Sequence, residues 1–329
     1  MRRNSTYLAI STGIALFGIA SAAVLGAKVL SLGEVVSLFT DPTAPLSALV
    51  WTLRAPRALT AFLVGSCLGL SGALFQGTFR NPLAEPYLLG SSAGASLGAA
   101  ISLLLPLPLP QAVSLPLFAF IGAWASTASV LVLSGMARIS DTAGVLLVGV
   151  AIGAMLAAAR SLVTLVYSDE TSSLRSVISW MLGGIQTPST AGLVALGVLT
   201  LLCLIVSLVL APGLDALGLG EETAKSMGLS VEKFRTVTVM LGAAAAGLAV
   251  TWGGVIGFIG LMAPHLVRWS LGGMHRRLLW HCTLVGGGLL AFLDGLSRTA
   301  AAPSEIPIGL MTALVGGPFF FVLLARRGR

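Results

Sequence analysis

Long apolar runs, each able to cross a lipid bilayer, recur along this 329-residue chain and restrict what it can fold into. A helix needs roughly 20 apolar residues to cross about 30 Å of hydrocarbon. Within a bilayer the backbone groups cannot reach water, so each crossing run must be helical. The sequence therefore predicts an all-α, polytopic membrane protein with ten transmembrane helices. The candidate spans are residues 6–27, 57–79, 88–105, 112–136, 142–166, 189–210, 232–251, 256–271, 278–297 and 306–325.

A scarcity of charged side chains supports this fold class. Only 9% of the residues are Asp, Glu, Lys or Arg, against about 25% in an ordinary soluble domain. The formal net charge of +7 would suggest a nucleic-acid partner in a soluble protein. Here the basic residues lie between apolar runs, so we expect the chain to contact membrane lipid and to bind no nucleic acid.

The distribution of Lys and Arg predicts the topology, because loops that retain these residues usually stay in the cytoplasm. With both termini inside, thirteen of the 19 basic residues fall in cytoplasmic segments and five in external ones. The cytoplasmic set is Arg2, Arg3, Arg80, Arg138, Lys225, Lys233, Arg235, Arg268, Arg276, Arg277, Arg326, Arg327 and Arg329. The external set is Lys28, Arg54, Arg57, Arg175 and Arg298. The first run also resembles a signal peptide, but retaining it fits the charges better.

Two segments between these runs have features of their own. Residues 28–56 contain three prolines and are expected to form an external segment. The uncharged run 236–267 is too long for one span and short for two, so a tight turn is expected at Gly253 and Gly254. Two unusually short, glycine-rich helices that meet at a turn would indicate a transport pathway.

Residues 211–231 form the longest polar stretch on the predicted cytoplasmic side. Their apolar spacing predicts two short amphipathic helices, with Gly218 and Gly220 at the break between them. Glu221 and Glu222 suit the first turn of the second helix, and Gly228 suits its end. Because nothing else in the chain would cover these apolar faces, we expect a partner protein; a position flat on the lipid surface is the alternative.

The glycines of the predicted spans are spaced for close helix packing. Gly90, Gly94 and Gly98 are four residues apart and would form one face of the third span. Such faces allow two helix backbones to approach one another. They indicate packing and do not identify a substrate.

Enzyme signatures are weak in this sequence. Residues 90–94 match the pattern G-x-S-x-G around Ser92, but the three histidines lie much later, at 265, 275 and 281, and no H-E-x-x-H is present. A P-loop needs Lys after Gly, whereas Lys28, Lys225 and Lys233 follow Ala, Ala and Glu. We therefore predict no catalytic residues and no ATPase site. Energy from ATP would have to come from another subunit.

Ionisable groups inside the spans are few. Arg160 is the most interior, and it should face protein or a water path because a buried charge is costly. Asp294 and Arg298 are one helical turn apart and can pair. No series of carboxylates crosses the spans, which argues against an ion-coupled secondary transporter, although this class remains the alternative. The three cysteines lack metal-ligand spacing, so no metal site is predicted.

Five ordered motifs resemble those of one family, the FecCD-type permeases, which import iron-siderophores, haem and cobalamin. The similarity runs from about residue 50 to the C-terminus. Residues 54–57 read Arg-Ala-Pro-Arg and 81–84 read Asn-Pro-Leu-Ala. The motifs as a whole cover residues 54–77, 79–94, 219–228, 257–268 and 305–309.

The resemblance implies a type II importer permease fold, with residues 1–329 as one transmembrane domain and 213–230 as its cytoplasmic coupling helices. It implies a homodimer in the bacterial inner membrane. It also implies two ATP-binding-cassette subunits below the dimer, which hold ATP and Mg, and a periplasmic or lipid-anchored substrate-binding protein outside. The permease itself would bind no cofactor and would move a metal chelate by alternating access.

The resemblance also assigns roles to individual residues. Contact with the ATPase is expected at Leu219, Gly220, Glu221, Glu222, Ala224, Met227 and Gly228. Docking of the binding protein is expected at Arg54, Arg57 and Arg298, for which positioning of helix ends is the alternative. The cytoplasmic gate is expected at Asn81, Pro82, Leu83, Asp141 and Thr142. Arg160 would lie on the pathway, but the family pattern assigns no role to an arginine there.

Overall fold

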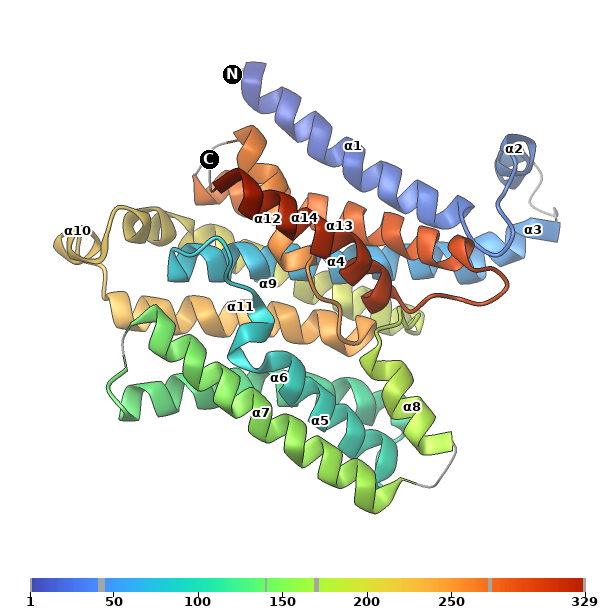
Figure 1. Cartoon of the computed structure of the whole chain (residues 1–329). Coiled ribbons are helices and arrows are strands. Elements are labelled where there is room, and N and C mark those ends of the chain that lie inside the picture. Colours follow the sequence, from blue (N-terminus) through green and yellow to red (C-terminus); the bar gives the residue numbers. More distant parts are fainter. Residues whose placement is uncertain (1, 41–44, 140, 169–171, 272–273, 328–329) are drawn as a thin grey trace.

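The computed structural model describes residues 2–40, 45–139, 141–168, 172–271 and 274–327, which fold into helices without any β-strand among them (Figure 1). The all-α prediction is therefore confirmed for this part of the chain. A helix lies at each predicted span. These helices are α1 (Arg2–Val24), α4 (Ala55–Phe79), α5 (Ser91–Leu104), α6 (Gln111–Met136), α7 (Thr142–Tyr167), α9 (Thr190–Gly218), α11 (Val231–Gly253), α12 (Ile259–Leu271), α13 (His275–Ala300) and α14 (Ile308–Arg327).

Seven helices among the described residues are long and apolar enough to cross a membrane unaided. The helices α5, α12 and α14 are the shorter ones, so the number of ten crossings stays a prediction. The turn expected at Gly253 and Gly254 is confirmed, because α11 ends at Gly253 and Gly254 has a φ of +65°. Of the two helices that meet at this turn, only α12 is unusually short, with 13 residues against 23 in α11.

The segment at 28–56, which the sequence predicts to be external, is partly helical. This segment contains α2 (Leu32–Thr40), α3 (Pro45–Ala48) and the π-helical turn η1 (Leu49–Arg54), which continues directly into α4. Pro56 follows that widened turn. A π-helical turn is common where the regular hydrogen-bond ladder of an α-helix is interrupted. The helical segment that includes α4 therefore begins about ten residues before the predicted span.

The long helix α4 forms the centre of the molecule. Every residue from Val64 to Phe79 is buried, and α13, α11, α12, α9 and α1 pack around it. Figure 1 shows α13 and α4 crossing the middle of the molecule side by side. By contrast, α7 and α9 present large apolar side chains at the surface, such as Leu147, Met155 and Val209. Such faces are expected to contact lipid or another subunit.

Close glycine packing between helices is confirmed. A Cβ atom on Gly94 would lie 2.1 Å from the carbonyl oxygen of Gly122, and one on Gly98 would lie 2.0 Å from that of Phe118. These contacts join α5 to α6. On α4, a Cβ on Gly65 would lie 2.3 Å from the carbonyl oxygen of Gly286 in α13. Only glycine permits backbones to approach this closely.

The tightest of these approaches gives a testable prediction. A Cβ on Gly72 of α4 would lie 1.8 Å from the carbonyl oxygen of Gly260 in α12. We expect Gly72→Ala to force the two helices apart and to destabilise the fold by about 1–3 kcal/mol or more. Thermal unfolding in detergent measures this effect. The control Gly135→Ala, where a new Cβ meets nothing within 4 Å, should leave the Tm unchanged or raise it; equal losses in both variants would contradict the packing account.

Candidate functional site

A short helix, α10 (Glu221–Ser226), projects at one end of the molecule (Figure 1). The prediction of a separate first amphipathic helix is wrong, because α9 continues through Pro212 to Gly218 without a break. The break and the second helix are found where expected. Gly220 has a φ of +119° directly before α10, and Gly228 has a φ of +85° after it.

The apolar residues around α10 point in two directions. Ala224 is fully buried against Leu217 and Val231, so part of the predicted apolar face packs within the chain. Leu219 and Met227, which flank α10, are 69% and 64% exposed. Whether these two side chains contact a partner protein or the lipid surface stays a prediction.

Polar contacts fix α10 to the membrane helix that follows it. Arg235 of α11 donates a hydrogen bond of 2.5 Å from Nη2 to Oε1 of Glu221, at the first residue of α10. Glu222, in contrast, extends into the surroundings, with Lys225 3.8 Å away. A force applied to α10 would therefore reach α11 through both the buried Ala224 and this ion pair.

The break before α10 shares a cavity with the loop after α4. The cavity has a volume of about 240 Å³, and its lining includes Gly218, Pro82 and Arg80. Arg268 of α12 also lines it and donates a hydrogen bond to the side-chain oxygen of Gln76. Gly218 of the predicted coupling segment and Pro82 of the predicted gate thus line one cavity, although more than 130 residues separate them in sequence.

One pair beside this cavity was missed by the sequence analysis. His275, the first residue of α13, lies with Nδ1 2.7 Å from Oδ1 of Asp215, and its backbone N–H donates to the same oxygen at 2.9 Å. This pair ties the start of α13 to the last turns of α9. An Asp and a His that are 60 residues apart give no local pattern from which the pair could have been predicted.

Two of the predicted gate residues stabilise turns. Asn81 accepts a hydrogen bond of 3.0 Å from the N–H of Leu83, and Asp141 caps α7 by accepting one of 2.8 Å from the N–H of Gly144. Thr142 begins α7. The two segments pack together, since one apolar cluster contains Ala84 from the first and Val145 and Ile152 from α7. A gating role for these residues stays a prediction.

Arg160 lies half-buried on α7, where its guanidinium donates to the sulfur of Met181 at 3.1 Å. Met181 is the last residue of α8 (Ser172–Met181), which follows α7 along the chain. A thioether is a weak acceptor, so this contact satisfies the charge poorly. The side chain thus links α7 to α8, and its pathway role stays a prediction.

The three arginines predicted to dock a partner make internal contacts, here called the arginine network, near the start of α4 and the end of α13, which lie at the end of the molecule opposite α10 (Figure 1). Arg298 pairs with Asp294, with 3.1 Å between Nε and Oδ2, as the sequence predicted. Arg57 bridges Asp294 and Glu305 at 3.1 and 2.9 Å. Arg54 donates to the backbone carbonyls of Val24 and Lys28 at 3.0 and 2.7 Å.

The members of this network differ in their exposure to solvent. Arg54 and Arg298 are only 7% and 5% exposed, and Asp294 is fully buried. Arg57 and Glu305 reach the surface. These contacts favour the alternative role of positioning helix ends, and contact of Arg54 and Arg298 with a binding protein stays a prediction.

An ion pair also orders the segment beside this network. Lys28 contacts Oε1 of Glu34 at 2.6 Å, and Ser31 donates to Oε2 of the same carboxylate. The hydrogen bonds from Lys28 and Ser31 lower the pKa of Glu34 to about 2. The carboxylate therefore stays charged through the physiological pH range, and the start of α2 keeps its cap.

The histidine contacts do not favour a hydrolase. His281 lies 2.8 Å from the hydroxyl of Ser11, and His265 lies 3.1 Å from the carbonyl of Leu261. Neither these contacts nor that of His275 involves Ser92. Among the described residues, no group of three or more His, Cys, Asp or Glu side chains could hold a metal ion.

Comparison with known proteins agrees with this architecture. Residues 14–326 match the FecCD transport family. A hemin transport system permease protein of Yersinia pestis is 39% identical over 84% of both chains. A vitamin B12 import system permease protein of Vibrio vulnificus is 39% identical over 92% of this chain and 91% of its own length.

Solved structures share the fold. A structure described as a metal-chelate type ABC transporter in an inward-facing conformation superposes with a TM-score of 0.82 at 30% identity. The similarity covers 97% of this chain and 99% of that one. The family match and the two relatives each span most of the sequence, so the chain belongs to the FecCD transport family and is an ABC importer permease.

Proposed function

We propose that this chain is the membrane-spanning subunit of an ATP-driven importer that moves a metal chelate through the bacterial inner membrane. Relatives named for hemin and vitamin B12 transport support haem or cobalamin as the cargo. The motif resemblance adds iron-siderophores to the candidates. The chelate crosses unchanged, so the permease needs no catalytic residue and no cofactor of its own.

The observation that carries this proposal is the projecting helix α10 with its exposed neighbours Leu219 and Met227. These side chains suit a groove on an ATP-binding-cassette subunit, which holds the ATP and Mg. The arginine network lies at the opposite end of the molecule, where a periplasmic or lipid-anchored binding protein would deliver the chelate. The start of α1 and the end of α14 lie toward the α10 end in Figure 1, which supports a cytoplasmic position for the two termini.

Ten crossings and a homodimer complete the proposed assembly. The short helices α5, α12 and α14 cross together with the seven longer ones, where neighbouring helices cover the ends that they do not reach. The exposed apolar faces of α7 and α14, such as those with Met155 and Phe321, suit a second copy of the chain. Between the copies, α7 with Arg160 lines the path, and residues 81–83 with Asp141 and Thr142 form its cytoplasmic gate.

The mechanism is a shift between two conformations. Closure of the two ATPases around ATP moves α10, and the contacts of α10 with α9 and α11 transmit that movement to the gate loop. A ligand can shift an equilibrium only by its differential affinity for the two states. The docked ATPase supplies that difference, because its closed and open forms hold the two α10 helices at different separations.

Deletion of the permease in its host tests the function and selects among the substrates. Uptake of labelled haemin, cyanocobalamin and a ferric siderophore is measured with and without the restored chain. We expect one of the three uptakes to be lost on deletion and to return with the wild-type chain. Unchanged uptake of all three chelates would contradict the proposal.

A further inference from the structure

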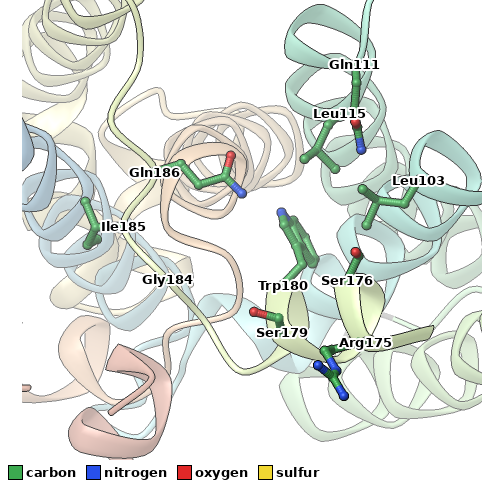
Figure 2. A pocket seen from close by; sticks show the side chains of 10 residues that line it. All are labelled: Leu103, Gln111, Leu115, Arg175, Ser176, Ser179, Trp180, Gly184, Ile185 and Gln186. Carbon is green, nitrogen blue, oxygen red and sulfur yellow. The ribbon is translucent and has the colours of Figure 1, made fainter. Parts of the chain in front are cut away.

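A cavity of about 540 Å³ lies at the end of the molecule that carries the arginine network, between α8 and the facing ends of α5 and α6 (Figure 2). Its size falls within the range of pockets that bind small molecules. Leu103 and Leu115 form part of an apolar wall, while Gln111 and Gln186 bring side-chain amides from opposite sides. None of the roles described above uses this cavity.

Trp180 lies at the centre of the cavity and has an unpaired donor. The residue is only 6% exposed, and its indole nitrogen has no hydrogen-bond partner among the described residues. Figure 2 shows that nitrogen directed into the space between the amides of Gln111 and Gln186. An indole N–H is a donor only, and a buried donor without a partner costs free energy. A ligand that pairs this donor would bring an acceptor atom such as oxygen.

The other lining residues narrow the ligand class. The amides of Gln111 and Gln186 can donate to the same oxygen or accept from a neighbouring N–H group. Arg175, an exposed residue of α8, adds a positive charge to the lining. A carboxylate or amide substituent on a largely apolar body would satisfy this combination. Haemin carries carboxylates of this kind, and cobalamin carries amides.

The residues around the cavity contact α7, which lines the proposed path, and also α11 and α14. The backbone N–H groups of Gly184 and Gln186 donate to the carbonyls of Gly253 and Trp252, both at 2.9 Å, at the end of α11. Gly309 of α14 donates to the carbonyl of Leu182 at 3.1 Å. Next to Trp180 in the chain, Met181 contacts Arg160 of α7. A ligand that binds Trp180 and restricts its movement would therefore affect α7, α11 and α14 through these contacts.

We propose that this cavity is a subsite that binds the acceptor-bearing substituent of the chelate, a carboxylate or an amide, through the indole N–H of Trp180. The proposal rests on the proposed function for the identity of the ligand. It adds a binding site within the permease, placed beside the route and next to Arg160. A loop of the binding protein could bring the same oxygen chemistry, and the experiment separates the two sources.

The test labels the whole permease, in complex with its ATPase, with 5-fluorotryptophan and follows the fluorine NMR signals. Trp180→Phe identifies the signal of Trp180, because that signal disappears when the labelled tryptophan is replaced. The substitution also adds no polar group to the cavity. Haemin, cyanocobalamin and the chelate-free binding protein are then titrated separately. Uptake kinetics are measured in parallel for Trp180→Phe, Gln111→Leu and the control Trp124→Phe, which alters an exposed tryptophan of α6 away from the cavity.

We expect a chelate alone to shift or broaden the Trp180 signal, with the Trp124 signal unchanged. Trp180→Phe and Gln111→Leu should raise the KM for that chelate about five- to tenfold with little change in kcat. A Trp180 signal that responds only to the binding protein, or to nothing, would overturn the subsite. Failure of the proposed function is a separate result, because it would abolish wild-type uptake whatever the Trp180 signal does.

Discussion

Replacing both Leu219 and Met227 by aspartate is expected to separate the permease from its ATPase and to abolish ATP-driven uptake. Both side chains are largely exposed, so the free permease loses little packing. In a complex they would be buried, and an apolar anchor at an interface contributes about 2 kcal/mol or more, which is about a 30-fold change in affinity. Two buried charges in their place should weaken binding further. Affinity for the ATPase is measured by titration in detergent, and uptake in vesicles.

A matched control is available on another helix. Met136, at the end of α6, is 76% exposed and lies far from α10 along the chain. Met136→Asp should leave ATPase binding near the wild-type value. Gly228→Arg and reversal of charge at Glu221 should also impair coupling, since Gly228 has a φ of +85° and Glu221 holds Arg235. Wild-type affinity in the Leu219 and Met227 double variant would refute the proposed interface.

The second large effect concerns Asp294, the fully buried centre of the arginine network. Asp294→Ala would leave Arg57 and Arg298 without the carboxylate that both contact at 3.1 Å. Removing one partner from a buried ion pair typically destabilises a protein by about 3–5 kcal/mol. We therefore expect a large fall in Tm, or loss of the folded protein from the membrane. Unfolding is followed by heating the purified permease in detergent.

Glu305 gives the comparison for this prediction. It contacts the same Arg57 at 2.9 Å, but its side chain is 54% exposed. An exposed ion pair contributes about 0–1 kcal/mol, so Glu305→Ala should change the Tm little. If docking is the main role of the network, the opposite ranking is expected, with Glu305→Ala reducing binding-protein affinity and Asp294→Ala leaving the Tm unchanged.

The positions of the helices could be predicted from the sequence because each apolar run carries its own signal. The turn at Gly253 and Gly254 and the break before α10 were predictable for the same reason, since glycines interrupt the pattern locally. The extension of α4 back through residues 45–54 was not predictable, because prolines usually interrupt a helical pattern. The π-helical turn η1 joins this segment directly to α4.

The contacts within the candidate sites were harder to predict from the sequence. Asp294 and Arg298 are one helical turn apart, so their pairing was predictable. The bridge from Arg57 to Asp294 joins residues 237 positions apart, and no local pattern encodes it. Ala224 could not be placed from the local pattern either. The amphipathic pattern assigned it to an exposed face, but it packs on Val231. Spacing along a helix gives relative directions, and only the tertiary packing decides which direction is covered.

The central claim is that a separate ATPase drives chelate transport through this chain. The most direct measurement is chelate accumulation in proteoliposomes that contain the permease, with and without its ATPase and ATP, in the presence of the loaded binding protein. We expect accumulation only when permease, ATPase and hydrolysable ATP are all present, and none with the Leu219 and Met227 double aspartate variant. Accumulation by the permease alone under a proton or sodium gradient would contradict it and would favour an ion-coupled secondary transporter.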